Sequence, residues 1–244
     1  MRSDLSFVNV YETKSLRSKI VTQLLYGDTF QKIKGNKFWL KIKCVLDNYT
    51  GYILKKKNFP DQKNTHKIFN LYAELYSKPN IKNKINKKLS FGSRIKVTEK
   101  RGSFYKFSNF WIKKKDLKMI NYETRNIFKY IKKFKNTRYK WGGKHFSGID
   151  CSGLIQIFFN FNNKYCPRDS KDQIKYFKKK VILKNIKKND LIFWKGHVAV
   201  AISRHKLIHA YGPLKKTVIM QTEKTIARIY KTANLKVIGI RRIT

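Results

Sequence analysis

Residues 148–154, Gly-Ile-Asp-Cys-Ser-Gly-Leu, place a cysteine where a glycine-rich loop turns into an apolar run. The apolar side chains of 154–159 recur at the spacing of a buried helix that begins at or near Cys151. Free backbone N–H groups and the positive end of the helix dipole stabilise a thiolate at such a position. The stretch therefore predicts a nucleophile, with a small buried structural cysteine as the alternative.

Two histidines further along the chain supply the other groups that a cysteine nucleophile needs. His197 opens a strand-like run, 197–202, and His209 lies near the end of the next one, 206–211. A base must accept the thiol proton, and a polar group must orient that base. We predict that Cys151 is the nucleophile and His197 the base.

Five short motifs occur in an order that resembles the NlpC/P60 cysteine peptidases, over roughly residues 119–244. They are Tyr139-x-Trp-Gly-Gly, Gly148-x-Asp-Cys-Ser-Gly-Leu, Asp190-Leu-Ile-Phe-Trp, His197-Val-Ala and Ile208-His-Ala. The resemblance implies a papain-like α+β catalytic domain in which His209 is the third catalytic residue and orients His197. It implies no metal and no other cofactor.

The chain before this region has the pattern of small β domains. Short apolar patches alternate with turn residues over 7–57, and 68–118 repeat the plan loosely, with the turn at 25–28 matched 65 residues later at 90–93. This pattern resembles bacterial SH3-like barrels, which often precede NlpC/P60 domains. We predict one SH3-like domain at 1–60, a second at 65–118, a polar linker at 58–67, and the catalytic domain at 119–244.

The catalytic region reads as helices followed by an antiparallel meander, which is an α+β arrangement. A helix is predicted through 127–134, where apolar side chains share one face, and another begins at Asp169 or Ser170. The predicted strands are 181–183, 191–194, 198–202, 207–210, 218–220 and 237–240.

The resemblance also assigns groups around the substrate. The backbone N–H of Cys151 and the hydroxyl of Tyr139 are expected to stabilise the oxyanion of a tetrahedral intermediate. Asp150 and Ser152, which flank the nucleophile, are expected to bind a substrate ammonium. Ser170 matches a substrate-contacting serine, with a helix cap as the alternative, and Tyr49 matches a tyrosine of the first SH3-like domain that closes the amine pocket.

Family members with SH3-like domains in front hydrolyse the γ-D-glutamyl–diamino acid bond of peptidoglycan stem peptides that have a free L-Ala amine. This γ-D-glutamyl-L-diamino acid endopeptidase activity is the function that the resemblance implies. Two alternatives stay open: an amidase or acyltransferase of the same fold, and a non-catalytic, basic SH3-like protein that binds anionic wall polymer or nucleic acid.

The charge of the chain is extreme, with 57 basic and 14 acidic residues and a net charge of +43. Such a surface attracts polyanions. The lysines are scattered through folded-looking segments, however, so we interpret them as solvated basic faces and expect a peptide rather than nucleic acid as the partner. The sequence does not indicate an oligomeric state.

The three cysteines, Cys44, Cys151 and Cys166, form neither a disulfide framework nor a metal-binding spacing. The N-terminal residues lack an apolar stretch of signal-peptide length, and no stretch approaches the roughly 18 apolar residues of a membrane span. The expected location is the bacterial cytoplasm, or the periplasm or exterior if the true start lies upstream.

Overall fold

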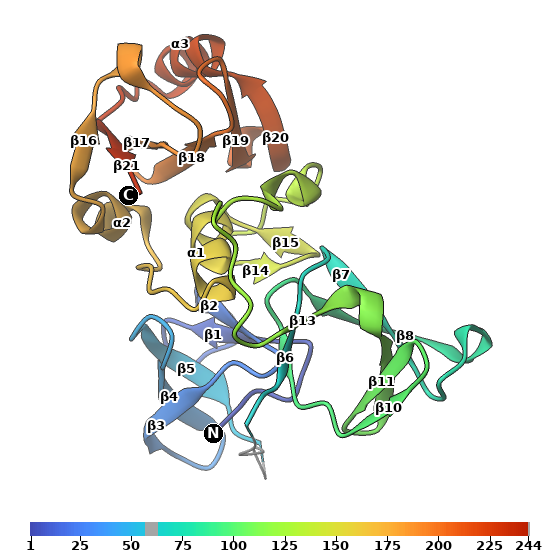
Figure 1. Cartoon of the computed structure of the whole chain (residues 1–244). Coiled ribbons are helices and arrows are strands. Elements are labelled where there is room, and N and C mark those ends of the chain that lie inside the picture. The colour runs from blue at the N-terminus through green and yellow to red at the C-terminus, as the bar shows by residue number, and fades with distance from the viewer. Residues whose placement is uncertain (57–62, 244) are drawn as a thin grey trace.

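The computed structural model describes residues 1–56 and 63–243 of the chain. Its parts meet around one helix, α1 (Cys151–Phe161). The C-terminal sheet lies on one side of α1 and two β-rich regions lie on the other (Figure 1). The α+β class with β-rich regions before the catalytic region is confirmed. None of the described helices is both long and apolar enough to cross a membrane.

The first β-rich region is one antiparallel five-stranded sheet in the order β2-β1-β5-β4-β3. Its burial alternates as a half-buried sheet requires: Leu40, Ile42 and Cys44 point into the core while their neighbours do not. In the described residues the pairing leaves the sheet open rather than closed as a barrel. The strands are β1 (Phe7–Tyr11), β2 (Ile20–Leu25), β3 (Phe30–Gly35), β4 (Trp39–Cys44) and β5 (Thr50–Leu54).

The second β-rich region has a five-stranded sheet, β10-β11-β12-β7-β8, and a three-stranded sheet, β13-β6-β9. The predicted linker at 58–67 falls partly outside the described residues, and its last two residues belong to β6. The elements are β6 (His66–Ile68), β7 (Tyr72–Tyr76), η1 (Ile81–Asn83), β8 (Lys84–Ser90), β9 (Arg94–Ile95), β10 (Glu99–Arg101), β11 (Phe104–Phe107), β12 (Phe110–Lys113), η2 (Lys114–Asp116) and β13 (Leu117–Met119).

The internal repeat appears as the same turn in both regions. Gly27 has φ +81° and Gly92 has φ +83°, a left-handed conformation that favours glycine. The two turns also touch, because the backbone N–H of Arg94 donates to the carbonyl of Tyr26 at 2.8 Å. The hairpins β4–β5 and β11–β12 correspond in the same way. The two β-rich regions thus pack turn against turn.

The C-terminal region is built on a six-stranded antiparallel sheet in the order β16-β21-β17-β18-β19-β20. Helix α1 packs against β18 and β19. The elements are η3 (Ile131–Phe134), β14 (Lys144–His145), β15 (Gly148–Ile149), α1, α2 (Ser170–Tyr176), β16 (Lys179–Val181), η4 (Leu183–Asn185), β17 (Leu191–Trp194), β18 (His197–Ala201), β19 (Lys206–Tyr211), η5 (Gly212–Leu214), β20 (Lys216–Gln221), α3 (Thr222–Ala233) and β21 (Gly239–Arg242).

One prediction for this region is wrong in detail, and one helix was missed. The helix predicted through 127–134 is a series of tight turns that ends in the 3₁₀ helix η3, with bonds three residues apart such as Ile131 N–H to Phe128 O at 3.0 Å. Its apolar residues are nevertheless buried, so periodicity identified the core but not the helix type. Helix α3 was not predicted, because only one of its faces, around Ile229, is buried.

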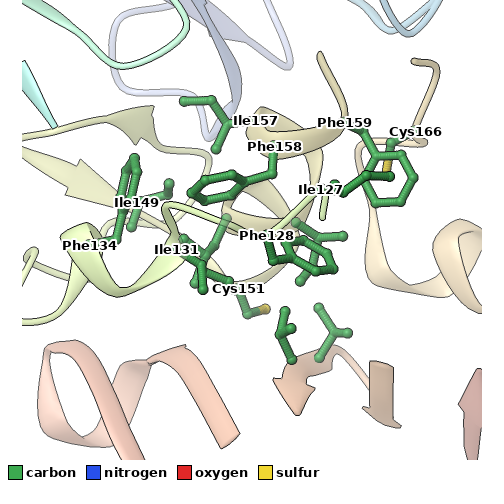
Figure 2. Packing of buried hydrophobic residues seen from close by; sticks show 14 of the residues in the cluster. Ile127, Phe128, Ile131, Phe134, Ile149, Cys151, Ile157, Phe158, Phe159 and Cys166 are labelled. Carbon is green, nitrogen blue, oxygen red and sulfur yellow. The ribbon is translucent and has the colours of Figure 1, made fainter. Parts of the chain in front are cut away.

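Helix α1 is buried along all of its residues, because both sides are covered. Strands β18 and β19 cover one side, and the turn residues Leu25 and Phe91 of the two β-rich regions join the same hydrophobic cluster. The ring of Phe91 stacks on that of Phe161 at 4.6 Å between centroids. Figure 2 shows Cys151 at the edge of this cluster, beside strands of the C-terminal sheet.

Candidate active site

Cys151 is the first residue of α1, as the sequence predicts. Asp150 is the N-cap, and its carboxylate accepts a hydrogen bond from the backbone N–H of Gly153 at 2.6 Å. The Cys151 side chain is 5% exposed, and its sulfur lies 4.0 Å from the carbonyl oxygen of Gly196. The backbone N–H groups of Ser152 and Val198 favour the charged form of the sulfur. The nucleophile therefore faces the start of β18, between the two residues that flank His197.

His197 and His209 lie on adjacent strands and are joined by a hydrogen bond of 2.8 Å between His197 Nε2 and His209 Nδ1. His209 is fully buried, and its ring stacks on Tyr211 at 4.7 Å between centroids. Because Nε2 of His197 is engaged, Nδ1 is the nitrogen that remains to accept a proton from a thiol. The cysteine and both histidines are thus brought to one place by α1, β18 and β19.

Burial favours the neutral forms of the thiol and the imidazole. Burial, followed by the charge of Asp150, raises the pKa of the Cys151 thiol to about 12. Burial lowers the pKa of His197 to about 4. The sequence predicted a lowered thiol pKa from the helix terminus, and desolvation outweighs that effect here. His197 can therefore act as a general base, which accepts the thiol proton while the sulfur attacks the substrate.

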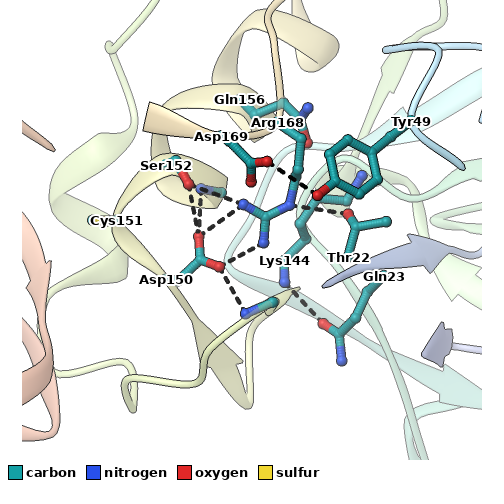
Figure 3. Close-up of polar contacts among 12 residues, drawn as sticks. Thr22, Gln23, Tyr49, Lys144, Asp150, Cys151, Ser152, Gln156, Arg168 and Asp169 are labelled. Atoms are coloured by element: carbon teal, nitrogen blue, oxygen red, sulfur yellow. Dashed lines mark hydrogen bonds and ion pairs between the residues drawn. The ribbon is translucent and has the colours of Figure 1, made fainter. Parts of the chain in front are cut away.

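The buried carboxylate of Asp150 accepts hydrogen bonds from several surrounding groups (Figure 3). Arg168 makes a two-pronged ion pair with it, Nη1 to Oδ1 at 3.0 Å and Nη2 to Oδ2 at 2.5 Å. The backbone N–H of Gly142 donates to Oδ2 at 2.8 Å, and Ser152 Oγ to Oδ1 at 3.3 Å. Arg168 is 2% exposed, so this is a buried pair. The carboxylate that was expected to bind a substrate ammonium already has a permanent cation.

The remaining predicted site residues surround this pair. Ser152 is buried and accepts from Arg168 Nη1 at 3.0 Å. Ser170 is the first residue of α2 and is also buried. Tyr139 is half-buried, and burial, followed by the neighbouring Cys151 and Asp150 side chains, raises the pKa of its hydroxyl. Its loop turns at Gly142, φ +72°, which lies directly against the backbone of Ile20.

The first β-rich region completes one side of the site (Figure 3). The hydroxyl of Tyr49 donates to Asp169 Oδ2 at 3.0 Å. Thr22 Oγ1, on β2, accepts from Arg168 Nε at 3.0 Å. The site is therefore shared between residues more than a hundred positions apart.

Sequence reasoning missed Arg168, Asp169 and Thr22. The tripeptide Arg168-Asp169-Ser170 carried a signal, because an Arg and an Asp beside a predicted helix start are unusual in a chain with so few acids. Thr22 had none. In the part of the chain that the structure describes, no cluster of His, Cys, Asp and Glu side chains is arranged to hold a metal ion.

A family model for the NlpC/P60 family matches residues 136–234, which contain the cysteine and both histidines. Residues 136–234 are an NlpC/P60 domain. A dipeptidyl-peptidase 6 of Lysinibacillus sphaericus is 25% identical over 228 residues, which are 83% of this chain and 84% of that protein. A probable endopeptidase, an NlpC homolog of Haemophilus influenzae, is 35% identical over 98 residues, 38% of this chain and 52% of that protein.

The similarity in fold extends over the whole chain. A crystal structure of an NlpC/P60 family protein from Bacillus cereus superposes with a TM-score of 0.82, covering 99% of this chain and 98% of the other at 20% identity. The β-rich regions thus belong to an architecture that a solved NlpC/P60 protein has in full. The family and the peptidase relatives identify this chain as a cysteine peptidase.

Proposed function

We propose that this NlpC/P60 peptidase hydrolyses the γ-D-glutamyl–diamino acid bond of peptidoglycan stem peptides whose N-terminal L-Ala amine is free. The observation that carries the proposal is the hydrogen bond of Tyr49 to Asp169, which joins the first β-rich region to the residue after Arg168, the partner of Asp150. A half-buried carboxylate held by a phenol suits a ligand that ends in an ammonium. The similarity to a dipeptidyl-peptidase 6 over most of both chains supports the same reading.

The proposed chemistry uses the neutral pair of thiol and imidazole. Cys151 Sγ attacks the γ-carbonyl carbon while its proton passes to His197 Nδ1, and the oxyanion is stabilised by the Cys151 backbone N–H and the Tyr139 hydroxyl. The C–N bond then breaks, and His197 gives the proton to the leaving amine of the diamino acid. Water, deprotonated by His197, hydrolyses the thioester and releases the dipeptide acid and the free thiol. His209 holds His197 in the required tautomer throughout.

We assign the substrate ammonium to Asp169 rather than to Asp150. Asp150 accepts five hydrogen bonds, two of them from Arg168. Asp169 is half-buried, and its Oδ2 accepts from Tyr49. It occupies the N-cap position of α2 without capping the helix through its side chain. Its carboxylate is thus available to a ligand, and Tyr49 orients it.

The central test is cleavage of L-Ala-γ-D-Glu-diaminopimelate by the whole chain. The wild type should release the dipeptide L-Ala-D-Glu, and Cys151→Ala should release none above background. Cys44→Ala, at a buried cysteine in the first β-rich region, is the matched control and should retain activity. Absence of cleavage by the wild type, or cleavage by Cys151→Ala, would refute the proposal.

The ammonium assignment has its own test. Asp169→Asn should lower kcat/KM for the free-amine substrate by at least tenfold, while hardly changing the slow turnover of the N-acetylated peptide. Asp172→Asn, three residues further along the same helix, removes an equal charge and should leave both values near those of the wild type. Equal losses on both substrates would show that Asp169 does not bind the amine.

A further inference from the structure

A basic groove lies on the C-terminal region, away from the nucleophile. It is a cavity of about 1080 Å³ beside the end of α2, β16 and the segment before β17. Six cationic side chains line it in addition to the paired Arg242: Arg125, Lys164, Lys178, Lys179, Lys187 and Lys188. All six are exposed, so their charges face the solvent-filled hollow.

The basic groove continues into a second cavity of about 750 Å³, which shares Lys187, Lys188 and Arg242 with it and adds Lys184 and Arg204. Among the described residues that line the two cavities, Asp190 is the only acid. Arg242 already pairs with it, through two hydrogen bonds of 2.8 Å. Cations gathered around a hollow without matching acids repel one another, and a bound polyanion relieves that repulsion. Two adjoining hollows suit a chain rather than a single small anion.

Two tyrosines distinguish the basic groove from a plain charged patch. Tyr165 is 42% exposed and Tyr176 is 43% exposed, although both line the cavity. Their rings meet edge to face, with centroids 5.3 Å apart. Exposed aromatic faces beside cations provide stacking surfaces for planar bases while the cations hold phosphates. A polymer without bases would use the cations alone.

The basic groove is separate from the active site. Asp190 and Lys188 precede β17, whereas His197 follows the turn at the other end of that strand. On α1, Phe159 lines the groove and Cys151 lies at the opposite end of the helix, about 12 Å away by helical rise. A ligand in the groove therefore leaves the nucleophile free.

We propose that the basic groove binds single-stranded nucleic acid. The phosphates would contact the lysines and arginines, and bases would stack on Tyr165 and Tyr176. This differs from the expectation that nucleic acid is not a partner, because the sequence displays the lysines as scattered and only the fold gathers them around one hollow with exposed tyrosines. The binding would be independent of sequence, since neither phosphate contacts nor stacking distinguishes one base from another.

The first test measures binding of fluorescein-labelled oligothymidylate of about 20 nucleotides by anisotropy over a range of salt concentrations. The logarithm of affinity should fall linearly with the logarithm of salt concentration, and Lys187→Ala/Lys188→Ala should reduce that slope by about 1.4, or about 0.7 for each lost phosphate contact. The control Lys32→Ala/Lys34→Ala removes the same charge from exposed positions of β3 and should leave the slope unchanged. Equal effects of the two pairs would overturn the proposal, because they would indicate diffuse attraction.

The second test separates nucleic acid from a bare phosphate chain. Tyr165→Ala/Tyr176→Ala should weaken oligothymidylate binding by about tenfold or more, whereas Tyr165→Phe/Tyr176→Phe should retain it, because phenyl rings still stack. Inorganic polyphosphate of similar charge should compete less well than unlabelled oligothymidylate. Equal competition, or wild-type binding by the alanine pair, would identify a polymer without bases and overturn the assignment. All groove variants should keep the activity of the wild-type peptidase.

Discussion

At the residue scale, the nucleophile lies next to a buried acid that the fold neutralises internally. Burial and, after it, the carboxylate beside Cys151 oppose formation of a thiolate and raise the pKa of the thiol. The resemblance in sequence assigned Asp150 to a substrate ammonium, whereas the structure pairs it with Arg168, held in turn by Thr22 of the first β-rich region. The Asp150–Arg168 pair is thus part of the framework around the nucleophile.

Removing one partner of this pair should be costly. Arg168→Met should lower the free energy of unfolding at pH 7 by about 3–5 kcal/mol, because it leaves Asp150 buried and unpaired. Adding Asp150→Asn should recover a substantial part of the loss, since the amide oxygen can still cap α1 while the unpaired charge is gone. Urea unfolding of both single variants and the double variant checks this. A double variant less stable than Arg168→Met would contradict the explanation.

The role of His209 predicts a selective kinetic defect. His209→Ala should lower kcat by about 10²-fold with little change in KM, because His197 loses the partner that fixes its tautomer. His209→Gln, which can still accept a hydrogen bond from His197, should retain more activity. The control is His205→Ala, at an exposed position on the turn before β19. Steady-state kinetics in which all three variants match the wild type would remove His209 from the mechanism.

At the element scale, α1 is satisfied at both ends by different parts of the chain. Asp150 caps its N-terminus, whereas its last carbonyl groups are reached by cations from the second β-rich region. Arg94 Nη2 donates to the carbonyl of Asn160 at 2.7 Å, and Lys67 Nζ to that of Phe161 at 2.5 Å. Cations are favoured at this end of a helix. The helix that carries the nucleophile is therefore fixed by contacts from outside the NlpC/P60 domain.

Lys67 should make the stability of the protein depend on pH. Its side chain is fully buried, and burial lowers its pKa to about 8, whereas the unfolded chain titrates at about 10.4. Between these values the unfolded state holds more protons, so this group makes stability rise as pH increases from about 8 to about 10. Lys67→Met should lack this contribution. The slope of its unfolding free energy against pH should differ from that of the wild type by the equivalent of up to about one proton.

The control for this measurement is Lys115→Met, at an exposed position in η2. Urea unfolding at several pH values should give this variant the same pH dependence as the wild type. If Lys67→Met also follows the wild type, Lys67 does not titrate with the pKa that its burial implies.

At the scale of the whole molecule, the β-rich regions are part of the catalytic core rather than attachments to it. Leu25 and Phe91, from equivalent turns of the two regions, belong to the hydrophobic cluster of α1. Tyr49 and Thr22 reach the polar groups near the nucleophile. An enzyme whose core and site are both shared in this way should lose activity when the regions separate.

Phe91 provides the test of this shared core. Phe91→Ala should destabilise the whole chain by about 3–5 kcal/mol, because a fully buried ring that packs on Phe158 and Phe161 leaves a cavity. The control is Phe38→Ala, where the ring is 63% exposed and the change should be within about 0.5 kcal/mol. We expect a single cooperative thermal transition that shifts for Phe91→Ala, and we expect activity to be lost at the same temperature. Loss of structure in the second β-rich region alone would argue against a shared core.

The sequence by itself determined the features that local patterns predict. These are the helix that starts at Cys151, the strands that carry His197 and His209, and the paired glycine turns at Gly27 and Gly92. These features depend on neighbouring residues, on helical or strand periodicity, and on motifs that are contiguous in the chain. The tight turns before η3 were predicted as a helix, because periodicity alone does not fix helix type. The amphipathic α3 was missed, because a mostly exposed helix has a weak pattern.

Only the tertiary structure decided which charges meet. Arg168 pairs with Asp150, Tyr49 meets Asp169, Lys67 reaches the end of α1, and lysines from separate segments surround one groove. Each of these contacts joins residues that the fold brings together, and its strength depends on burial, which the linear order of residues does not reveal. The same burial raises the pKa of Cys151 above the value expected from its helix position, because removing water from a charge outweighs the local field of a helix end.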